Sequence, residues 1–124
     1  QKRLGLGIVI ITHNLNIVRH VADHMAIMYL GKFVEQGTSE DIFRHPRHPY
    51  TKALLSANPN PDPDAQSDRL DLAGEVPSLL NVPNGCEFHT RCPFVQTDCR
   101  ESAPVSREAA PGHIFHCHYP LKED

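Results

Sequence analysis

The 124-residue sequence lacks long hydrophobic runs. Its longest apolar runs, residues 8–11 and 25–30, are far shorter than the roughly 20 residues that span a bilayer, so we expect no segment to cross a membrane. Long basic runs are also missing and the formal net charge is -3, which argues against a nucleic-acid partner. The first residues of the sequence do not show the basic residues, apolar segment and small-residue cleavage site of a secretory signal peptide. We therefore expect a cytosolic setting in which thiols stay reduced.

Proline divides the sequence into two unlike parts. Most of the eleven prolines follow residue 57, and residues 58–70 are also acidic and have no apolar periodicity. Such a composition predicts an extended linker. We therefore expect an N-terminal part over residues 1–57, a linker over 58–70 and a small, irregular C-terminal extension over 71–124, in which prolines prevent any long helix. Because the chain opens with Gln1 and its first predicted strand begins almost at once, we expect a piece of a longer protein.

The N-terminal part reads as α/β. Residues 7–12, GIVIIT, form a β-branched apolar run typical of a buried strand in a parallel sheet. Asn14 follows as a candidate helix N-cap, ahead of apolar residues at helical spacing. His13 would then lie at the carboxyl end of a buried strand, where open α/β sheets bind their ligands. By position alone, such a histidine is more often structural than ligand-binding.

Further elements follow in this part. Residues 25–30 predict a second strand, and Gly31-Lys32 is typical of a two-residue hairpin turn. Thr38 and Asp41 have the spacing of a capping box that opens a short helix over residues 39–43. Pro49 is expected to be the first residue of another helix, which continues to residue 55.

Residues 8–37, IVIITHNLNIVRHVADHMAIMYLGKFVEQG, closely resemble the closing section of the nucleotide-binding subunits of ATP-binding cassette (ABC) transporters. Residues 10–15, IITHNL, resemble the switch-histidine segment of that family. The resemblance implies the C-terminal end of a P-loop ABC nucleotide-binding domain, which binds ATP with Mg²⁺. It also implies that His13 hydrogen-bonds the γ-phosphate and helps to arrange the attacking water, a positioning and charge-stabilising role.

Residues 45–59, HPRHPYTKALLSANP, and 74–93, GEVPSLLNVPNGCEFHTRCP, are similar to the C-terminal extension of oligopeptide, dipeptide and nickel importers. This resemblance implies an ATP-binding subunit at the cytoplasmic face of the inner membrane. Its partners would be a second ATP-binding subunit, membrane permease subunits and, indirectly, an extracytoplasmic substrate-binding protein. The sequence contains no phosphate loop, no strand with the magnesium-binding and catalytic acids, and no signature motif. We therefore expect no ATPase activity from these 124 residues alone.

The four cysteines of the chain have the spacing C-x5-C-x6-C-x17-C, and they are Cys86, Cys92, Cys99 and Cys117. A cytosolic setting disfavours disulfides. Structural zinc is usually bound by more closely spaced cysteine pairs, whereas iron–sulfur clusters accept wider spacings. In bacterial cluster-binding sequences a ligand cysteine is often followed by proline, as at Cys92-Pro93. From the residues, a cluster and zinc both stay open. The importer resemblance implies a [4Fe-4S] cluster with all four cysteines as ligands, and we expect its role to be structural rather than sensory.

Several histidines lie near the cysteines, and we expect them to surround the site rather than to bind its metal: His89, His113, His116 and His118. His45 and His48 each precede a proline and are interpreted as turn residues. An alternative function, from a different class, is a free-standing metal-binding or redox-sensing module whose similarity to the transporters is incidental.

Overall fold

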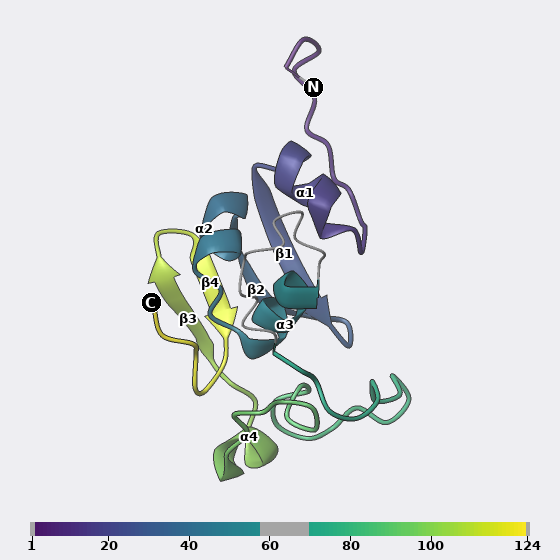
Figure 1. Ribbon diagram of the computed structural model, residues 1–124, viewed down its shortest axis with the longest axis vertical. Helices are drawn as coiled ribbons and strands as arrows, with labels where there is room; N and C mark the ends of the chain where they lie inside the picture. Colours follow the sequence, from purple (N-terminus) through teal and green to yellow (C-terminus); the bar gives the residue numbers. More distant parts are fainter. Residues whose placement is uncertain (1, 58–69, 124) are drawn as a thin grey trace.

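A computed structural model describes residues 2–57 and 70–123. In this part of the chain, four strands form one antiparallel sheet in the order β1-β2-β4-β3 (Figure 1). The helices and strands are α1 (Leu15–Val21), β1 (His24–Tyr29), β2 (Lys32–Thr38), α2 (Ser39–Arg44), α3 (Pro49–Ala57), α4 (Thr97–Glu101), β3 (Ser106–Ala110) and β4 (His113–His116). The α/β class is confirmed, but the expected parallel sheet is wrong for the described residues.

The expected strand over residues 7–12 is also wrong. These residues form an irregular segment that runs away from the sheet ahead of α1 (Figure 1). Val9 and Ile11 are 91% and 98% exposed. A strand needs neighbours for its backbone hydrogen bonds and cover for its apolar faces, and no described strand pairs with this run. Asn14 is confirmed as the N-cap of α1, because its Oδ1 accepts from the backbone N–H of Asn16 at 3.1 Å.

The predicted hairpin is confirmed, but its turn lies one residue earlier. Tyr29 pairs with Lys32, so Leu30 and Gly31 are the two central residues. Both have positive φ, 47° for Leu30 and 80° for Gly31. Two positive φ values are the pattern of a type I′ turn, whose twist matches that of the strands it joins. The sequence pattern around Gly31-Lys32 had suggested glycine at the first central position instead.

Both predicted helix starts are confirmed. Thr38 Oγ1 accepts from the Asp41 backbone N–H at 3.1 Å and donates to Asp41 Oδ2 at 2.8 Å. This capping box begins α2, which ends at Arg44. Pro49 is the first residue of α3, where its missing N–H costs no hydrogen bond. This helix continues to Ala57, two residues beyond the predicted end.

The C-terminal part is less irregular than expected, because it supplies two strands to the sheet. β4 pairs with β2 through Glu35 opposite Phe115 and Gln36 opposite Ile114. Segments from either side of the predicted linker therefore share one sheet. Residues 58–69, which make up nearly all of that linker, lie outside the described residues. Within the described ranges, no helix has both the length and the apolar character needed to span a membrane.

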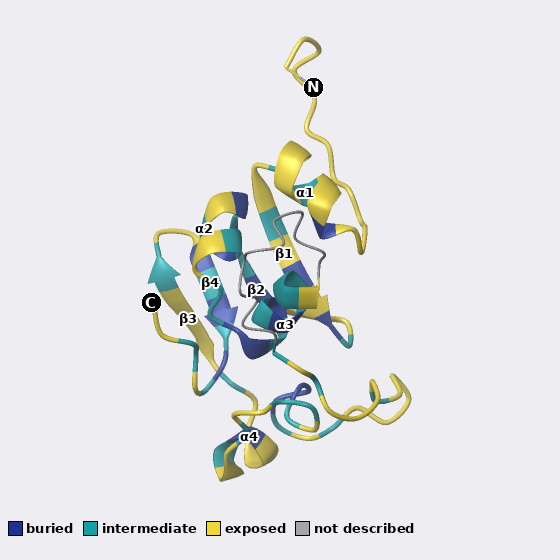
Figure 2. Cartoon of the chain, viewed as in Figure 1, coloured by how far each residue is buried: buried dark blue, intermediate teal, exposed yellow. Residues whose placement is uncertain are grey.

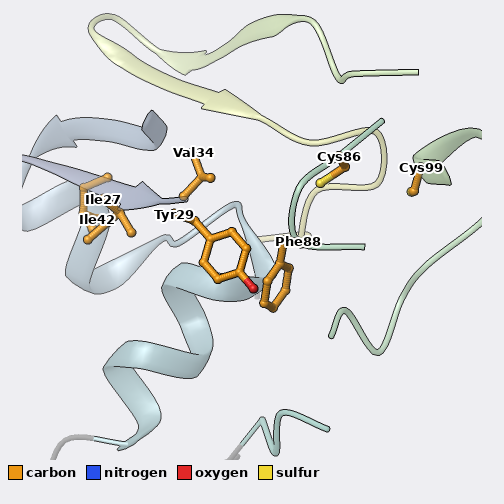
Figure 3. Close-up of a cluster of buried hydrophobic side chains, with 7 residues drawn as sticks. All are labelled: Ile27, Tyr29, Val34, Ile42, Cys86, Phe88 and Cys99. Carbon is orange, nitrogen blue, oxygen red and sulfur yellow. The ribbon is translucent and has the colours of Figure 1, made fainter. Parts of the chain in front are cut away.

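The buried side chains gather where the sheet, α2 and the loop before α4 meet, whereas α1 and the segment before it are largely exposed (Figure 2). The hydrophobic cluster comprises Ile27, Tyr29, Val34, Ile42, Cys86, Phe88 and Cys99 (Figure 3). Phe88 packs edge-to-face against Tyr29 with 5.3 Å between ring centroids. Two cysteines therefore extend a core that β1, β2 and α2 begin.

Candidate functional site

The structure brings the four cysteines together at one pocket. They come from separate places: two precede α4, one lies within it and one follows β4. Three of them are buried, Cys92 is half-buried, and all four are free thiols. Sequence analysis selected the same four residues, although their spacing gave no information on how the chain would assemble them.

Backbone contacts hold Cys86 and Cys99 side by side. The Cys86 N–H donates to the carbonyl oxygen of Cys99 at 2.8 Å. Gly85 permits this approach: its φ is +72°, and a Cβ at this position would lie 2.4 Å from the Cys99 oxygen. A side chain at residue 85 would therefore be strained twice, by backbone conformation and by contact.

The chain after β4 is fastened to α4, which places Cys117 beside Cys99. The Tyr119 hydroxyl donates to the two carboxylate oxygens of Asp98 at 2.9 and 2.8 Å. His118 Nε2 donates to the Ser102 carbonyl oxygen at 2.8 Å. Both bonds are exposed, and His118 and Tyr119 line the pocket.

Burial governs the acidity of these thiols. It raises the pKa of Cys86 to about 11 and that of Cys117 to about 12, and it also raises the pKa of Cys92. The neighbouring cysteines add to each shift, because a second thiolate nearby disfavours the first. A bound cation would reverse this preference, since metal binding requires and stabilises thiolates.

The residue types at the pocket are those that bind a metal centre through thiolates. Four sulfur atoms line one pocket, and thiolates are the usual ligands of both iron–sulfur clusters and structural zinc. However, among the described residues no three His, Cys, Asp or Glu side chains form a group that could hold a metal ion. The structure therefore brings the predicted ligands together without arranging three of them around one ion. Both the [4Fe-4S] cluster and zinc stay predictions.

His48 belongs to this pocket, which the sequence did not indicate. Its side chain is 1% exposed and lines the pocket together with the cysteines. Burial, with a smaller effect of His116, lowers the pKa of His48 to about 3, so the ring is neutral at physiological pH. Its Nδ1 accepts from the backbone N–H of Tyr50 at 3.0 Å. His48 does stand in a turn, as expected, but its ring is part of the site.

The other histidines near the cysteines have different environments. His89 and His118 line the pocket, and His89 Nδ1 donates to the Cys86 carbonyl oxygen at 2.8 Å. His113 lies elsewhere: it is buried and its Nε2 donates to Glu35 Oε1 at 2.6 Å. Glu35 was not a candidate from sequence, because an acidic residue in a strand pattern gives no sign of burial.

Glu35 joins three parts of the chain. Its carboxylate accepts from the backbone N–H of Arg47 at 2.8 Å and from that of His48 at 2.9 Å, in addition to His113. These partners stand in the loop between α2 and α3 and on β4. A fully buried carboxylate is tolerated when its oxygens are hydrogen-bonded in this way. The backbone that carries His48 is thereby fixed to the sheet.

His13 lies apart from these elements in sequence, at the bend directly before the N-cap of α1. Its side chain is exposed. The buried strand that was expected to precede it is not formed, so its predicted contact with the γ-phosphate of ATP stays a prediction.

The family match and the similar curated proteins both come from peptide and dipeptide transport. Residues 34–99 match the family described as "Oligopeptide/dipeptide transporter, C-terminal region". The chain is 54% identical over 117 residues to the dipeptide transport ATP-binding protein DppF of Escherichia coli, covering 94% of this chain and 35% of that protein. It is 46% identical to the Haemophilus influenzae DppF over 94% of this chain and 36% of that protein.

A putative peptide import ATP-binding protein of Brucella ovis is 47% identical over 94% of this chain and 37% of its own length. The chain therefore spans little more than a third of the length of these curated relatives.

Proposed function

The chain belongs to the oligopeptide/dipeptide transporter C-terminal region family, and from this premise we propose that it is the C-terminal part of the ATP-binding subunit of an ABC importer. The observation that carries this proposal is similarity to peptide and dipeptide import ATP-binding proteins over 94% of the chain. The subunit would bind ATP with Mg²⁺, and its cargo would be peptides or nickel. It would work at the cytoplasmic face of the inner membrane.

In this function ATP binding closes two nucleotide-binding subunits and moves the permease subunits, and hydrolysis reopens them. An extracytoplasmic substrate-binding protein delivers the cargo. His13 contributes a hydrogen-bond donor to the γ-phosphate, and the neighbouring N-terminus of α1 favours negative charge. The phosphate loop, the magnesium-binding acid and the signature motif would come from outside residues 1–124, because the sequence contains none of them. These residues alone would not hydrolyse ATP.

The test uses the full-length subunit in its transporter. His13→Ala is expected to lower the ATPase rate by at least about a hundredfold, since it removes a group that acts on transition-state charge. His20→Ala is the matched control, because His20 is an exposed histidine seven residues further along, in α1. Equal loss in both variants, or no loss in His13→Ala, would contradict the assignment. Measurable ATPase activity of purified residues 1–124 would contradict the claim that these residues alone do not hydrolyse ATP.

For the cysteine pocket, we propose that Cys86, Cys92, Cys99 and Cys117 hold a [4Fe-4S] cluster, with zinc as the alternative. Support comes from the assembly of all four thiols at one pocket. Such a centre would cross-link the separate segments that carry the cysteines, and its binding free energy would become folding free energy. Its role would therefore be structural.

Anaerobic purification distinguishes the two centres. A brown protein with broad absorption near about 400 nm and matching iron and sulfide contents is expected for the cluster. Colourless protein with one zinc per chain would support the alternative. A Cys99→Ala variant should lose the bound metal in either case, whereas metal content that is unchanged by this substitution would exclude the pocket as the site.

A further inference from the structure

The His48 ring has a buried N–H group for which no described residue serves as hydrogen-bond acceptor. Its Nδ1 accepts a hydrogen bond from the Tyr50 backbone N–H, 3.0 Å away, so that nitrogen has no hydrogen of its own. The neutral ring must then carry its hydrogen on Nε2. His48 Nε2 is buried and has no hydrogen-bond partner among the described residues. Buried donors are rarely left unpaired, because leaving water without a new partner costs free energy.

The ring is 1% exposed and is held by contacts on both its backbone and its face. The His48 backbone N–H donates to Glu35 Oε2 at 2.9 Å, and Pro49 begins α3 directly afterwards. The ring also packs against Phe88, with 5.6 Å between centroids. The unpaired donor is therefore a fixed feature of the site.

His48 borders two hollows of the structure. It lines the pocket of the four cysteines, and it also lines a groove of about 420 Å³ that Cys86 lines as well. The groove contains His116, whose Nδ1 is a second buried atom without a partner among the described residues. The possible acceptors are therefore cysteine sulfur and the His116 ring.

The bond to Tyr50 also limits what His48 can do. To bind a metal through Nε2, the ring would have to move its hydrogen to Nδ1 and give up the bond from the Tyr50 N–H. His48 is thus suited to donate to a metal-bound group rather than to bind the metal itself. Metal-bound thiolate and inorganic sulfide carry negative charge, and charged acceptors form stronger hydrogen bonds than a neutral imidazole nitrogen does.

We propose that His48 is a positioning residue that donates its Nε2–H to a sulfur atom of the centre held by the four cysteines. This inference rests on the proposed iron–sulfur centre. A hydrogen bond to cluster sulfur stabilises the more reduced state, so His48 would raise the reduction potential and slow the loss of the cluster.

The test compares the wild-type protein with His48→Phe and His48→Gln after anaerobic loading with ferrous iron and sulfide. Phenylalanine keeps a ring of similar shape but has no donor, whereas glutamine keeps an N–H at a similar reach. The midpoint potential is expected to shift to a more negative value in His48→Phe and to return toward wild type in His48→Gln. His45→Phe is the control, because His45 also precedes a proline but is exposed.

The outcomes separate this inference from the proposed centre. If the wild type binds no iron, both are overturned. If the wild type and the variants bind equal iron and show equal potentials, the cluster stands and the role of His48 is overturned.

A second measurement does not depend on a variant that folds. In nitrogen-resolved NMR spectra of wild-type histidines, the His48 Nε2–H signal should move when the centre is loaded. A His48 Nε2–H signal that stays unchanged when the centre is loaded would overturn the proposal.

Discussion

Glu35 and His113 form a buried ion-pair geometry, 2.6 Å between Oε1 and Nε2, although 78 residues separate them in the sequence. Glu35 stands on β2 and His113 begins β4, two strands that pair with each other in the sheet. The same carboxylate holds the loop that carries His48. One acidic side chain therefore connects the N-terminal sheet, the C-terminal strand and the wall of the cysteine pocket.

This connection gives a first prediction about stability. Glu35→Ala leaves three donors, two of them buried, without their acceptor and is expected to lower the free energy of unfolding by about 3 kcal/mol or more. Glu40→Ala is the control, because Glu40 is exposed and its pair with Arg44 lies on the surface of α2. Its loss should stay below about 0.5 kcal/mol. Urea unfolding of both variants measures the difference, and similar losses would show that the buried carboxylate is not a structural link.

A second prediction compares two glycine substitutions, one that introduces backbone strain alone and one that adds a steric clash. Gly85 and Gly112 both have positive φ, +72° and +79°. A Cβ on Gly85 would meet the Cys99 oxygen at 2.4 Å, whereas a Cβ on Gly112 would have no neighbour within 4 Å. Gly112→Ala should therefore cost only the backbone strain, about 1–2 kcal/mol.

Gly85→Ala should cost more than Gly112→Ala, because the Cys86–Cys99 backbone contact must open as well. It should also reduce metal uptake by the cysteine pocket, which Gly112→Ala should leave unchanged. Urea unfolding and metal analysis of the two proteins check both points. Equal stability losses would mean that the contact between Gly85 and α4 relaxes without consequence.

The local elements were predictable because their causes are local. Asn14 and Thr38 cap the helices that follow them, and Pro49 begins α3, all through contacts within a few residues. The run at residues 7–12 was interpreted wrongly because its pattern shows only that the segment suits a buried strand. Whether a strand forms depends on pairing and cover, and the described residues provide neither.

The sequence indicated which cysteines to consider as a candidate site but not how the chain brings them to one pocket. Cysteine is a distinctive ligand type where thiols are expected to stay reduced, and it marked four candidates: Cys86, Cys92, Cys99 and Cys117. Glu35 and His48 gave no comparable signal, since glutamate and histidine are most often exposed or structural. Their roles come from contacts across long sequence separations, which the order of residues does not specify.

A third prediction concerns the cap of α2. Thr38→Ala removes the acceptor for the Asp41 N–H and should lower the free energy of unfolding by about 1 kcal/mol. Thr38→Ser keeps the hydroxyl and should retain most of the stability. Thermal or urea unfolding of the two variants tests this difference. If serine were as damaging as alanine, the methyl group rather than the hydrogen bond would be responsible.

The last prediction follows from the neutral ring of His48. Burial lowers its folded-state pKa from 6.5 to about 3, whereas an unfolded histidine titrates near 6.5. Above pH 6.5 both states are neutral at this residue and its stabilising contribution is fully present. Between pH 6.5 and 3 the unfolded state binds a proton that the folded state refuses, so the free energy of unfolding should fall by up to about 1.4 kcal/mol per pH unit from this group. His48→Gln cannot be protonated in this range. Its unfolding free energy, followed by urea titration from pH 7 to 4, should therefore decrease less steeply than that of the wild type, and parallel curves would show that His48 is protonated in the folded state.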